Sequence, residues 1–414
     1  MLHYKSKLKI PQFFVSIGAG TNQVPLITAA KRLGFNVIGV DRNPCAEGAG
    51  LCDLKIQESI DNYEEIYQKI LAIILFGDIK GVLSRSYGSA VKSACFIANK
   101  LNIPLMPYER MDDFISKNRM KSVFETNGLN TPLYIQTDQN NFRKAVSKLS
   151  YPCVVKPVTG HAKTGVQRIE SKADMQHFLA GNDRKKCPFI IEEFVRGDEI
   201  IAVGMIYQHR YNLIGITDKK LTPPPYFVDL EHIYPSRYFD LWDRISAIGQ
   251  RVADAFDIAT SPLIMELIVS EGRELSLIEA APEFGGEFIS DVLIPEGTGY
   301  NLIQQSIRAV SGLGFRTPVQ KRIKASIAVR YITARPGTLA SWNEKAARRL
   351  PGILHVKLFK KAGSATAFPT TNHDRIGVII ARGKTREAAQ AAAARAESAL
   401  NITLNESESG HNEQ

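Results

Sequence analysis

A stretch of the chain that is otherwise apolar carries six glutamates. Residues 264–288 read IMELIVSEGRELSLIEAAPEFGGEF, so acidic side chains recur among Ile, Leu and Val residues. Magnesium prefers oxygen ligands, and enzymes usually bind it through one or two carboxylates together with the phosphates of a substrate. Two of these glutamates placed side by side could therefore hold a divalent cation against a phosphorylated substrate.

The spacing of the glutamates indicates which pair this would be. Two partly alternating runs flank Gly272-Arg273, a sequence that fits a two-residue hairpin turn. That turn would place Glu266 directly opposite Glu279 on one face of the hairpin, and Glu271 opposite Glu274 beside the turn. Like charges in such a pair are destabilising unless something neutralises them. Spacing alone leaves the inner pair open between a magnesium site and a solvated hairpin, whereas the outer pair is expected to be solvated.

Two lysines lie around a glycine-containing loop in the middle of the chain. Residues 151–169 read YPCVVKPVTGHAKTGVQRI, which predicts a strand with Lys156 at its end and then a loop from Thr159 to Gly165. The backbone amides of such a loop can approach phosphate oxygens, and Lys156 and Lys163 supply positive charge. The loop lacks the GK[ST] sequence of a Walker A motif, and by itself it fits a structural turn equally well.

The first 110 residues alternate predicted strands and helices. The strand FFVSIGAG, the helix QVPLITAAKRLG and the strand FNVIGVD come first, and the alternation continues. It predicts a parallel, doubly wound sheet. A dinucleotide-binding fingerprint fails because Gln23 stands at its third glycine, even though Asp41 ends the second strand. Gly18, Gly20 and the loop at 84–88 are instead candidates for binding a small substrate at the carboxyl ends of the strands.

The composition narrows the class of protein. The 414 residues predict two to three domains, and a hydrophobic content of 44% is ample for their cores. No apolar run is long enough to span a membrane, and five cysteines without CxxC spacing predict reduced thiols in a cytoplasmic protein without a zinc site. The net charge of +10 is spread along the chain, which disfavours nucleic-acid binding and fits an enzyme with anionic substrates.

The order of these features resembles that of the ATP-grasp superfamily. Lys117 on a predicted helix, Lys156 before the glycine loop, the sequence IIEEFVRGDE at 190–199 and the two hairpin glutamates form an ordered set that no single motif provides. The flanking regions look like the N-terminal domain of that superfamily and the C-terminal domain of L-amino-acid ligases. The resemblance implies an α/β fold with a parallel N-terminal domain, a two-lobed ATP-grasp domain and a small α+β C-terminal domain. The expected ranges are 1–112 for the N-terminal domain, 113–315 for the ATP-grasp domain, 316–403 for the C-terminal domain and 404–414 for a disordered tail. Within the ATP-grasp domain, the nucleotide lobe is expected at about 120–195 and the metal and substrate lobe at about 196–315.

The resemblance also implies a role for individual residues, with ATP and Mg2+, or Mn2+ in its place, as cofactors. Phosphate contacts would come from Lys117 and Lys156, and the loop from His161 to Gly165, with Lys163, would close over the γ-phosphate. The adenine would be held by Glu192 and the backbone of Glu193 and Val195, the ribose by Glu199, and the metal by Glu266 and Glu279. Lys156 and Lys163 are accordingly catalytic candidates.

The chain departs from the pattern of this superfamily after the second metal glutamate. Relatives usually carry Asn two residues on and Arg four residues on, where this chain has Ala281 and Glu283 ahead of Gly285-Gly286. Either the position is compensated elsewhere, for instance by Arg330 or Arg335, or Glu283 completes the metal site or binds a cationic group such as a substrate amine. The catalytic candidates here are Glu283 and Arg330, and the substrate-binding candidates are Glu283, Gly285, Gly286 and Glu287.

Other candidates for substrate contact are fewer. The segment FVDLEHIYPSRYFD at 227–240 interrupts the sheet pattern, and similar segments in relatives line the substrate pocket, which nominates Glu231 and His232. A surface loop position fits His232 equally well. Tyr300 and Asn301 are expected to cap a helix.

The implied activity is that of an ATP-dependent carboxylate–amine ligase, most like a dipeptide-forming L-amino-acid ligase. Its partners would be a small-molecule carboxylate and an amine, without a nucleic acid or a membrane, and a homodimer is one option. A carboxylase-type enzyme that uses carboxyphosphate is an alternative. A nucleotide-binding protein impaired at Ala281 and Glu283 is another, but the retained lysines and metal glutamates count against it.

Overall fold

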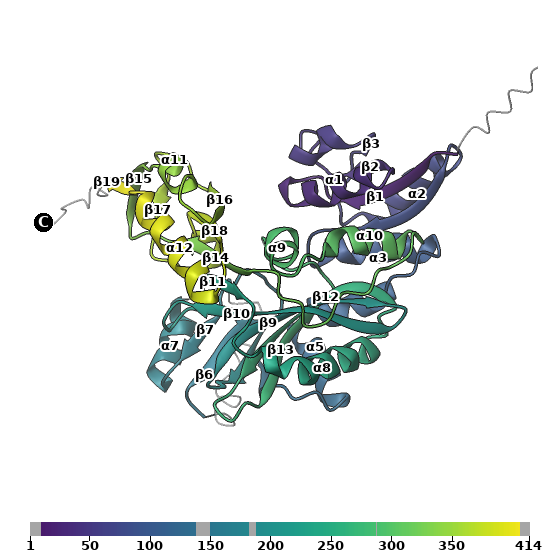
Figure 1. Cartoon of the computed structure of the whole chain (residues 1–414). Coiled ribbons are helices and arrows are strands. Elements are labelled where there is room, and N and C mark those ends of the chain that lie inside the picture. Colours follow the sequence, from purple (N-terminus) through teal and green to yellow (C-terminus); the bar gives the residue numbers. More distant parts are fainter. Residues whose placement is uncertain (1–9, 138–149, 182–187, 287, 406–414) are drawn as a thin grey trace, which may run out of the picture.

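The computed structural model describes residues 10–137, 150–181, 188–286 and 288–405 (Figure 1). Its N-terminal part, purple to blue in Figure 1, contains a four-stranded sheet in the order β3-β2-β1-β4 with parallel pairing throughout, as the alternating pattern predicted. The strands are β1 (Gln12–Ile17), β2 (Asn36–Val40), β3 (Leu54–Ile56) and β4 (Asp78–Leu83), and the helices are α1 (Val24–Arg32), α2 (Tyr63–Ile74) and α3 (Ser89–Lys100). The Asp41 carboxylate accepts a hydrogen bond from the Ala19 amide (2.9 Å), so it stabilises the glycine turn.

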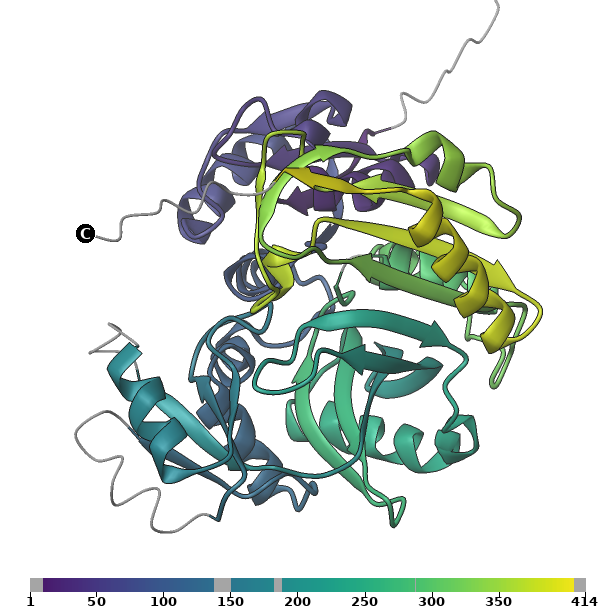
Figure 2. The same cartoon turned by 90° about the vertical axis from the view of Figure 1, so that its left-hand side faces the viewer.

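A small antiparallel sheet follows and forms a separate lobe. Its order is β5-β8-β6-β7, and Figure 2 shows it in blue and teal, set apart from the larger sheet. Lys156 lies near the end of β6, as predicted. The strands are β5 (Tyr134–Thr137), β6 (Cys153–Pro157), β7 (Gln167–Ile169) and β8 (Phe189–Glu193), accompanied by α4 (Met111–Ile115), α5 (Lys117–Thr126) and α7 (Lys172–Gly181).

The largest element is an eight-stranded antiparallel sheet that runs from the centre of the chain into its C-terminal part. Its order is β13-β12-β9-β10-β11-β14-β18-β16, so the domain boundary that we expected at residue 315 crosses a continuous sheet. The strands are β9 (Asp198–Tyr207), β10 (Arg210–Leu221), β11 (Asp229–Tyr234), β12 (Thr260–Val269), β13 (Leu275–Ala281), β14 (Ser326–Ile332), β16 (Ile353–Leu358) and β18 (Gly377–Gly383). The segment at 227–240 thus contributes a full strand, and our expectation that it interrupts the sheet was wrong.

Helices cover this sheet where its sequence is apolar. In the C-terminal part, α12 (Arg386–Ala399) buries alanines spaced along one side against β14 and β18. Closer to the centre, α8 (Trp242–Ala255) packs on β10, and α10 (Leu302–Val310) contacts β12 and β4. Asn301 accepts a hydrogen bond from the Gln304 amide at the start of α10, which confirms the predicted helix cap. None of the helices in the described part of the chain is long and apolar enough to cross a membrane.

The acidic hairpin is built differently from the prediction near its turn but not at its centre. Ser270 rather than Glu271 faces Glu274, and the three-residue loop between them has Arg273 at a φ of 60°, where the predicted turn had two residues. A bulge between Glu266 and Leu267 then restores the predicted register, and Glu266 pairs directly with Glu279. The two deviations cancel because each shifts the pairing by one residue.

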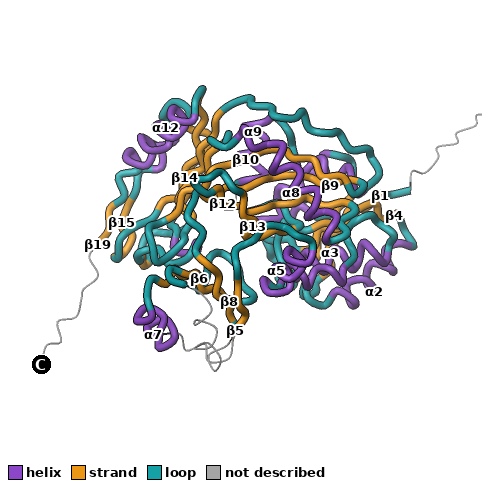
Figure 3. Tube along the Cα trace, turned by 90° about the horizontal axis from the view of Figure 1, so that it is seen from below, coloured by secondary structure: helices purple, strands orange, loops and turns teal. Residues whose placement is uncertain are grey.

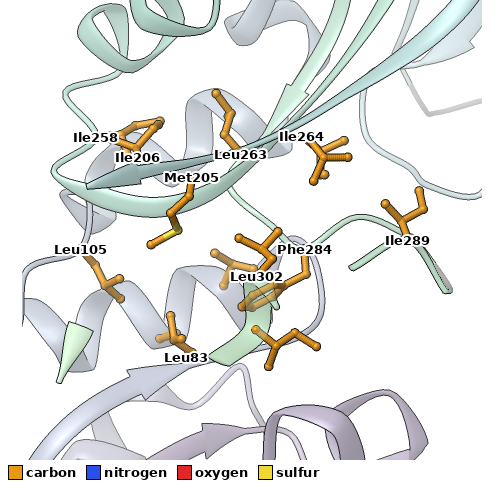
Figure 4. Close-up of a cluster of buried hydrophobic side chains, with 14 of the residues drawn as sticks. Leu83, Leu105, Met205, Ile206, Ile258, Leu263, Ile264, Phe284, Ile289 and Leu302 are labelled. Atoms are coloured by element: carbon orange, nitrogen blue, oxygen red, sulfur yellow. The ribbon is translucent and has the colours of Figure 1, made fainter. Parts of the chain in front are cut away.

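A shared apolar core connects the N-terminal sheet to the large sheet. Leu83 at the end of β4, Met205 on β9, Leu302 on α10 and Phe284 after β13 are buried in one cluster (Figure 4). Leu83 directly precedes the loop at 84–88, and Phe284 directly precedes the pair Gly285-Gly286. The core therefore holds these two loops near one another.

The C-terminal end of the described chain belongs to a third small sheet. β15 (Gly337–Ser341) pairs with β17 (Ala365–Thr366) and with β19 (Thr403–Asn405), at the opposite end of the molecule from β1 and β4 in Figure 3. Residues 404 and 405, which we expected in a disordered tail, are hydrogen-bonded in β19 instead, and the rest of that tail lies outside the described residues.

Candidate active site

A cavity of about 950 Å³ lies where the three parts of the chain meet. It receives the loop at 84–88 from the N-terminal part, the glycine loop from the small lobe, and residues 357–360 and 372–375 from the C-terminal part. The predicted site residues that line it are Lys117, Lys156, His161, Lys163, His232, Glu266, Glu279, Glu283, Gly285 and Gly286. Those described residues that do not line it are Gly165, Glu192, Glu193, Val195, Glu199, Glu231 and Arg330, and Glu287 lies outside the described residues.

Lysines surround the two carboxylates of the hairpin. The Nζ atoms of Lys163 and Lys219 lie 3.2 and 3.1 Å from Glu266 Oε2. On the other strand, Lys117 Nζ lies 3.4 Å from Glu279 Oε1. Burial acts to raise the pKa of Glu266, but the two ammonium groups outweigh it and hold that pKa below its usual range. Glu266 is therefore ionised at neutral pH, and the site contains both the anionic ligands a metal needs and the cations that a polyphosphate needs.

Lys219 is a site residue that the sequence analysis missed. Its side chain on β10 is only 1% exposed, and its Nζ lies 3.1 to 3.2 Å from carboxylate oxygens of Glu199, Asp229 and Glu266. Burial acts to lower the pKa of Lys219, but the three carboxylates raise it well above its ordinary value. The available signal was Lys219 at the end of the run LIGITDK, which begins with apolar residues and is buried throughout. A buried cation there requires carboxylate partners.

Glu192 is engaged with two lysines within the protein, and its role at the adenine stays a prediction. Its carboxylate contacts Lys156 Nζ at 2.8 Å and Lys121 Nζ at 3.3 Å. Lys121, one helical turn beyond Lys117, is fully buried and also donates a hydrogen bond to Thr131 Oγ1 (2.6 Å). Burial lowers the pKa of Lys121 to about 8. The cluster carries two positive charges and one negative charge, and it fixes Lys156 at the cavity wall.

The neighbouring Glu193 is also used internally. Its amide donates to the Leu133 carbonyl (2.9 Å), and its carboxylate accepts from the Leu133 amide (3.1 Å). The amide of Glu193 is thus paired within the protein, and the contact of its backbone with the adenine stays a prediction.

Replacing Lys121 by alanine should lower the free energy of unfolding by about 3 kcal/mol, because Glu192 keeps only one of its two buried cations. Urea unfolding of the full chain measures this. Lys31→Ala is the control, since Lys31 contacts Asp53 (2.7 Å) on the surface with 40% of its side chain exposed, and it should cost less than about 1 kcal/mol. Equal effects of the two substitutions would contradict the importance of the buried cluster.

Glu231 and Arg330 lie away from the cavity, and their predicted roles there are not supported. The strand pairing of β11 shifts at a bulge opposite Lys220 and Leu221, so that His232 faces the cavity and Glu231 the other side of the sheet. There Glu231 Oε1 accepts from Arg330 at 2.8 Å, and Glu231 Oε2 accepts from Gln390 of α12 at 2.9 Å. Both residues therefore hold α12 on the sheet.

Comparison with known proteins places this arrangement in a family. Residues 149–291 match the sequence model of the ATP-grasp domain, and residues 330–405 match that of the L-amino acid ligase C-terminal domain 2. The chain thus contains an ATP-grasp domain. Its fold is similar to the crystal structure of an L-amino acid ligase from Bacillus licheniformis, with a TM-score of 0.78 and 20% identity over 95% of this chain and 99% of that chain.

Two curated proteins are similar in sequence to this ATP-grasp chain. An uncharacterized protein, y4rH, from Sinorhizobium fredii is 24% identical over 92% of this chain and 78% of its own length. An alanine–anticapsin ligase from Bacillus amyloliquefaciens is 27% identical over 41% of this chain and 41% of its own length.

His232 places a buried imidazole at the wall of the cavity. The imidazole is 3% exposed, lies edge to face with Tyr331, and its Nδ1 makes no hydrogen bond with any described residue. Burial lowers the pKa of His232 to about 4. The ring is therefore neutral at physiological pH and can donate or accept one hydrogen bond with a ligand.

Glu283 places a carboxyl group where the ATP-grasp pattern has arginine. Burial raises its pKa to about 8, assisted by the carboxylates of Glu279 and Glu266, while Arg85 acts to lower it. The guanidinium of Arg85 is itself paired with Asp291 (2.8 Å). This corner of the cavity thus holds more acidic than basic groups, and it favours a cation.

The donor chemistry of the hairpin fits magnesium. Glu266 and Glu279 provide oxygen ligands from adjacent strands, and a divalent cation would neutralise the negative charge that, after burial, raises the pKa of Glu283. No group of three or more His, Cys, Asp or Glu side chains in the described ranges forms a complete metal site alone. Such a site fits an ion that takes its remaining ligands from substrate phosphates and water.

Proposed function

We propose that this ATP-grasp protein is an ATP-dependent ligase that joins the carboxyl group of an amino acid to the amine of a second amino acid or other amine. The observation that carries the proposal is the arrangement around Glu266 and Glu279, which face each other across a hairpin while Lys117, Lys163 and Lys219 contact them inside one cavity. The match of residues 330–405 to an L-amino acid ligase domain supports the choice of substrate class.

The residues of the cavity suit a reaction through an acyl-phosphate. A substrate carboxylate oxygen attacks the γ-phosphorus of ATP, the bond to the bridging oxygen breaks, and ADP leaves. The amine nitrogen then attacks the acyl carbon, and phosphate and a proton leave as the amide forms. Lys156 and Lys163 hold phosphate oxygens during these steps, and the loop from His161 to Gly165 excludes water from the acyl-phosphate. Magnesium, held by Glu266 and Glu279, would supply further charge neutralisation at the phosphates.

Glu283 is the group that would select the substrate. Its carboxylate lines the cavity beside Gly285 and Gly286, where the acyl group is expected. An ammonium group of a basic or diamino substrate, or the α-amino group of an amino acid, would pair with it. Arg335 and Arg330 do not line this cavity, and the arginines in its described wall are Arg85 and Arg375.

The test is phosphate release from ATP and magnesium across pairs of amino acids, with amide product measured in parallel. We expect release that requires an amino acid and matches the amide formed. Release that depends on bicarbonate alone would favour the carboxyphosphate alternative and overturn the ligase proposal. Absence of amino-acid-dependent release across the panel would also overturn it. A homodimer, a cytoplasmic location and Mn2+ as an alternative ion stay predictions.

A further inference from the structure

A short segment of the C-terminal part reaches into the cavity and contacts the glycine loop. Residues 372–374 form a single turn of 3-10 helix, and Thr371 and Asp374 cap it reciprocally. The Asp374 carboxylate also accepts hydrogen bonds from the amides of Thr370 and Thr371 (both 2.8 Å). The segment is thus held in shape by its own hydrogen bonds and can serve as a rigid contact surface.

Asn372 is the residue through which this segment contacts the two sides of the phosphate site. Its amide donates to the Ala162 carbonyl (3.0 Å) in the glycine loop. Its side chain accepts from the Asp229 amide (3.0 Å) and donates to the Asp229 carboxylate (2.6 Å). Asn372 therefore contacts the loop through its backbone and β11 through its side chain.

Each of these contacts leads to a lysine at Glu266. Ala162 directly precedes Lys163, and Asp229 Oδ1 lies 3.2 Å from Lys219 Nζ. Both lysines approach the same oxygen of Glu266, at 3.2 and 3.1 Å. Asn372 thus contacts the residue before Lys163 and the carboxylate partner of Lys219, the two lysines that approach Glu266.

The glycine loop needs such a support. Ala162 and Lys163 have φ values of 55° and 60°, in the left-handed region that is unfavourable for residues with a Cβ atom. Conformations of this kind cost about 1–3 kcal/mol and persist only where surrounding contacts impose them. On either side of the loop, His161 lies 4.3 Å from the ring of Tyr87 and 5.9 Å from that of His373, measured between centroids. The loop is therefore held by both the N-terminal and the C-terminal parts.

We infer that Asn372 is a positioning residue, which keeps the glycine loop in the conformation that directs Lys163 to Glu266 and keeps Asp229 beside Lys219. The inference rests on the proposed function in that these lysines bind the phosphates of ATP. The C-terminal part of the chain then shapes the phosphate site directly and does not only cover it.

The experiment compares Asn372→Ala with Asn343→Ala in the full chain. Asn343 is an asparagine in the same part of the protein that caps α11 (Glu344–Arg348) and does not line the cavity, so it controls for a general loss of stability. We measure hydrogen exchange of residues 160–166 without nucleotide, and the affinity for a non-hydrolysable ATP analogue with magnesium. Alanine keeps the backbone amide that donates to Ala162 but removes both side-chain hydrogen bonds to Asp229 that hold the segment in place. For Asn372→Ala we therefore expect exchange to be roughly tenfold faster and affinity roughly tenfold weaker. For Asn343→Ala we expect neither change.

Exchange and affinity that are the same in the two variants would overturn the inference. If Asn372→Ala does not fold, Asn372→Ser takes its place, since the hydroxyl retains one of the two side-chain hydrogen bonds and should give a smaller change in the same direction. Neither measurement needs an amino-acid substrate. A failed ligase assay therefore leaves this test intact, and an unchanged loop in Asn372→Ala leaves the ligase proposal intact.

Discussion

Replacing Glu279 by glutamine should lower ATP-dependent phosphate release about a hundredfold or more. The amide has nearly the same size as the carboxylate, so the hairpin pairing with Glu266 can persist. It lacks the charge that would bind magnesium and that contacts Lys117 at 3.4 Å. The measurement is the initial rate of phosphate release at saturating ATP, repeated over a range of magnesium concentrations. The concentration that gives half of the maximal rate should rise in the variant.

The matched control is Glu271→Gln, the same substitution in the loop of the same hairpin. Glu271 is exposed and lies outside the cavity, so its replacement should leave the rate and the magnesium dependence unchanged. A Glu279→Gln protein with full activity would refute the proposed metal role. A thermal unfolding curve like that of the parent protein would exclude misfolding as the cause of a lost rate.

Replacing Glu283 by arginine should change which substrate is used, by about a hundredfold in the ratio of kcat/KM between a cationic and a neutral amino acid. A carboxylate in a desolvated corner attracts an ammonium group, and a guanidinium in its place repels it. The corner contains Arg85, which is already paired with Asp291 at 2.8 Å. The substituted arginine would therefore add a second guanidinium to this corner, where Glu279 and Glu266 already contact lysines. The measurement is the competition between the two substrates for amide formation.

Glu283→Gln separates two causes of that change. It removes the negative charge without adding a positive one, so the substrate ratio should move part of the way in the same direction. If both variants keep the parent ratio, Glu283 does not select the substrate, and the position is one that the rest of the cavity compensates. Because glutamine and glutamate differ little in volume, a change in shape cannot account for an altered preference.

The sequence predicted the parts of the site that depend on local order along the chain. Glu266 and Glu279 belong to one hairpin, and their pairing could be derived from alternation and a turn, even though the turn was wrong and a bulge corrected it. Lys156 and the loop after it were visible for the same reason, as a strand end followed by glycines. The alternating N-terminal part likewise revealed its parallel sheet.

The parts that were missed depend on contacts between distant segments. Lys219 and Asp229 acquire their role only when β10 and β11 lie beside β9 and β12, so that three carboxylates meet around one ammonium group. Glu231 was misplaced because neighbouring residues of a strand point to opposite faces, so Glu231 and His232 cannot both line the cavity. Lys121 was overlooked because its burial against Glu192 follows from how α5 packs on the small lobe, which no periodicity in the helix reveals.

The continuous sheet has a consequence for how this chain could be divided or recombined. β14 is hydrogen-bonded to β11 along four residue pairs, from Glu231 with Arg330 to Tyr234 with Ile327. A chain that ended near residue 315 would leave β11 as a bare edge, with unpaired amides and carbonyls that invite association with other chains. The C-terminal quarter is therefore not a removable accessory. A chimera with a relative that still folds would have to take all strands of the large sheet from one parent. Otherwise its junction would have to lie between elements that are not hydrogen-bonded to each other as strands, such as the small lobe and the large sheet.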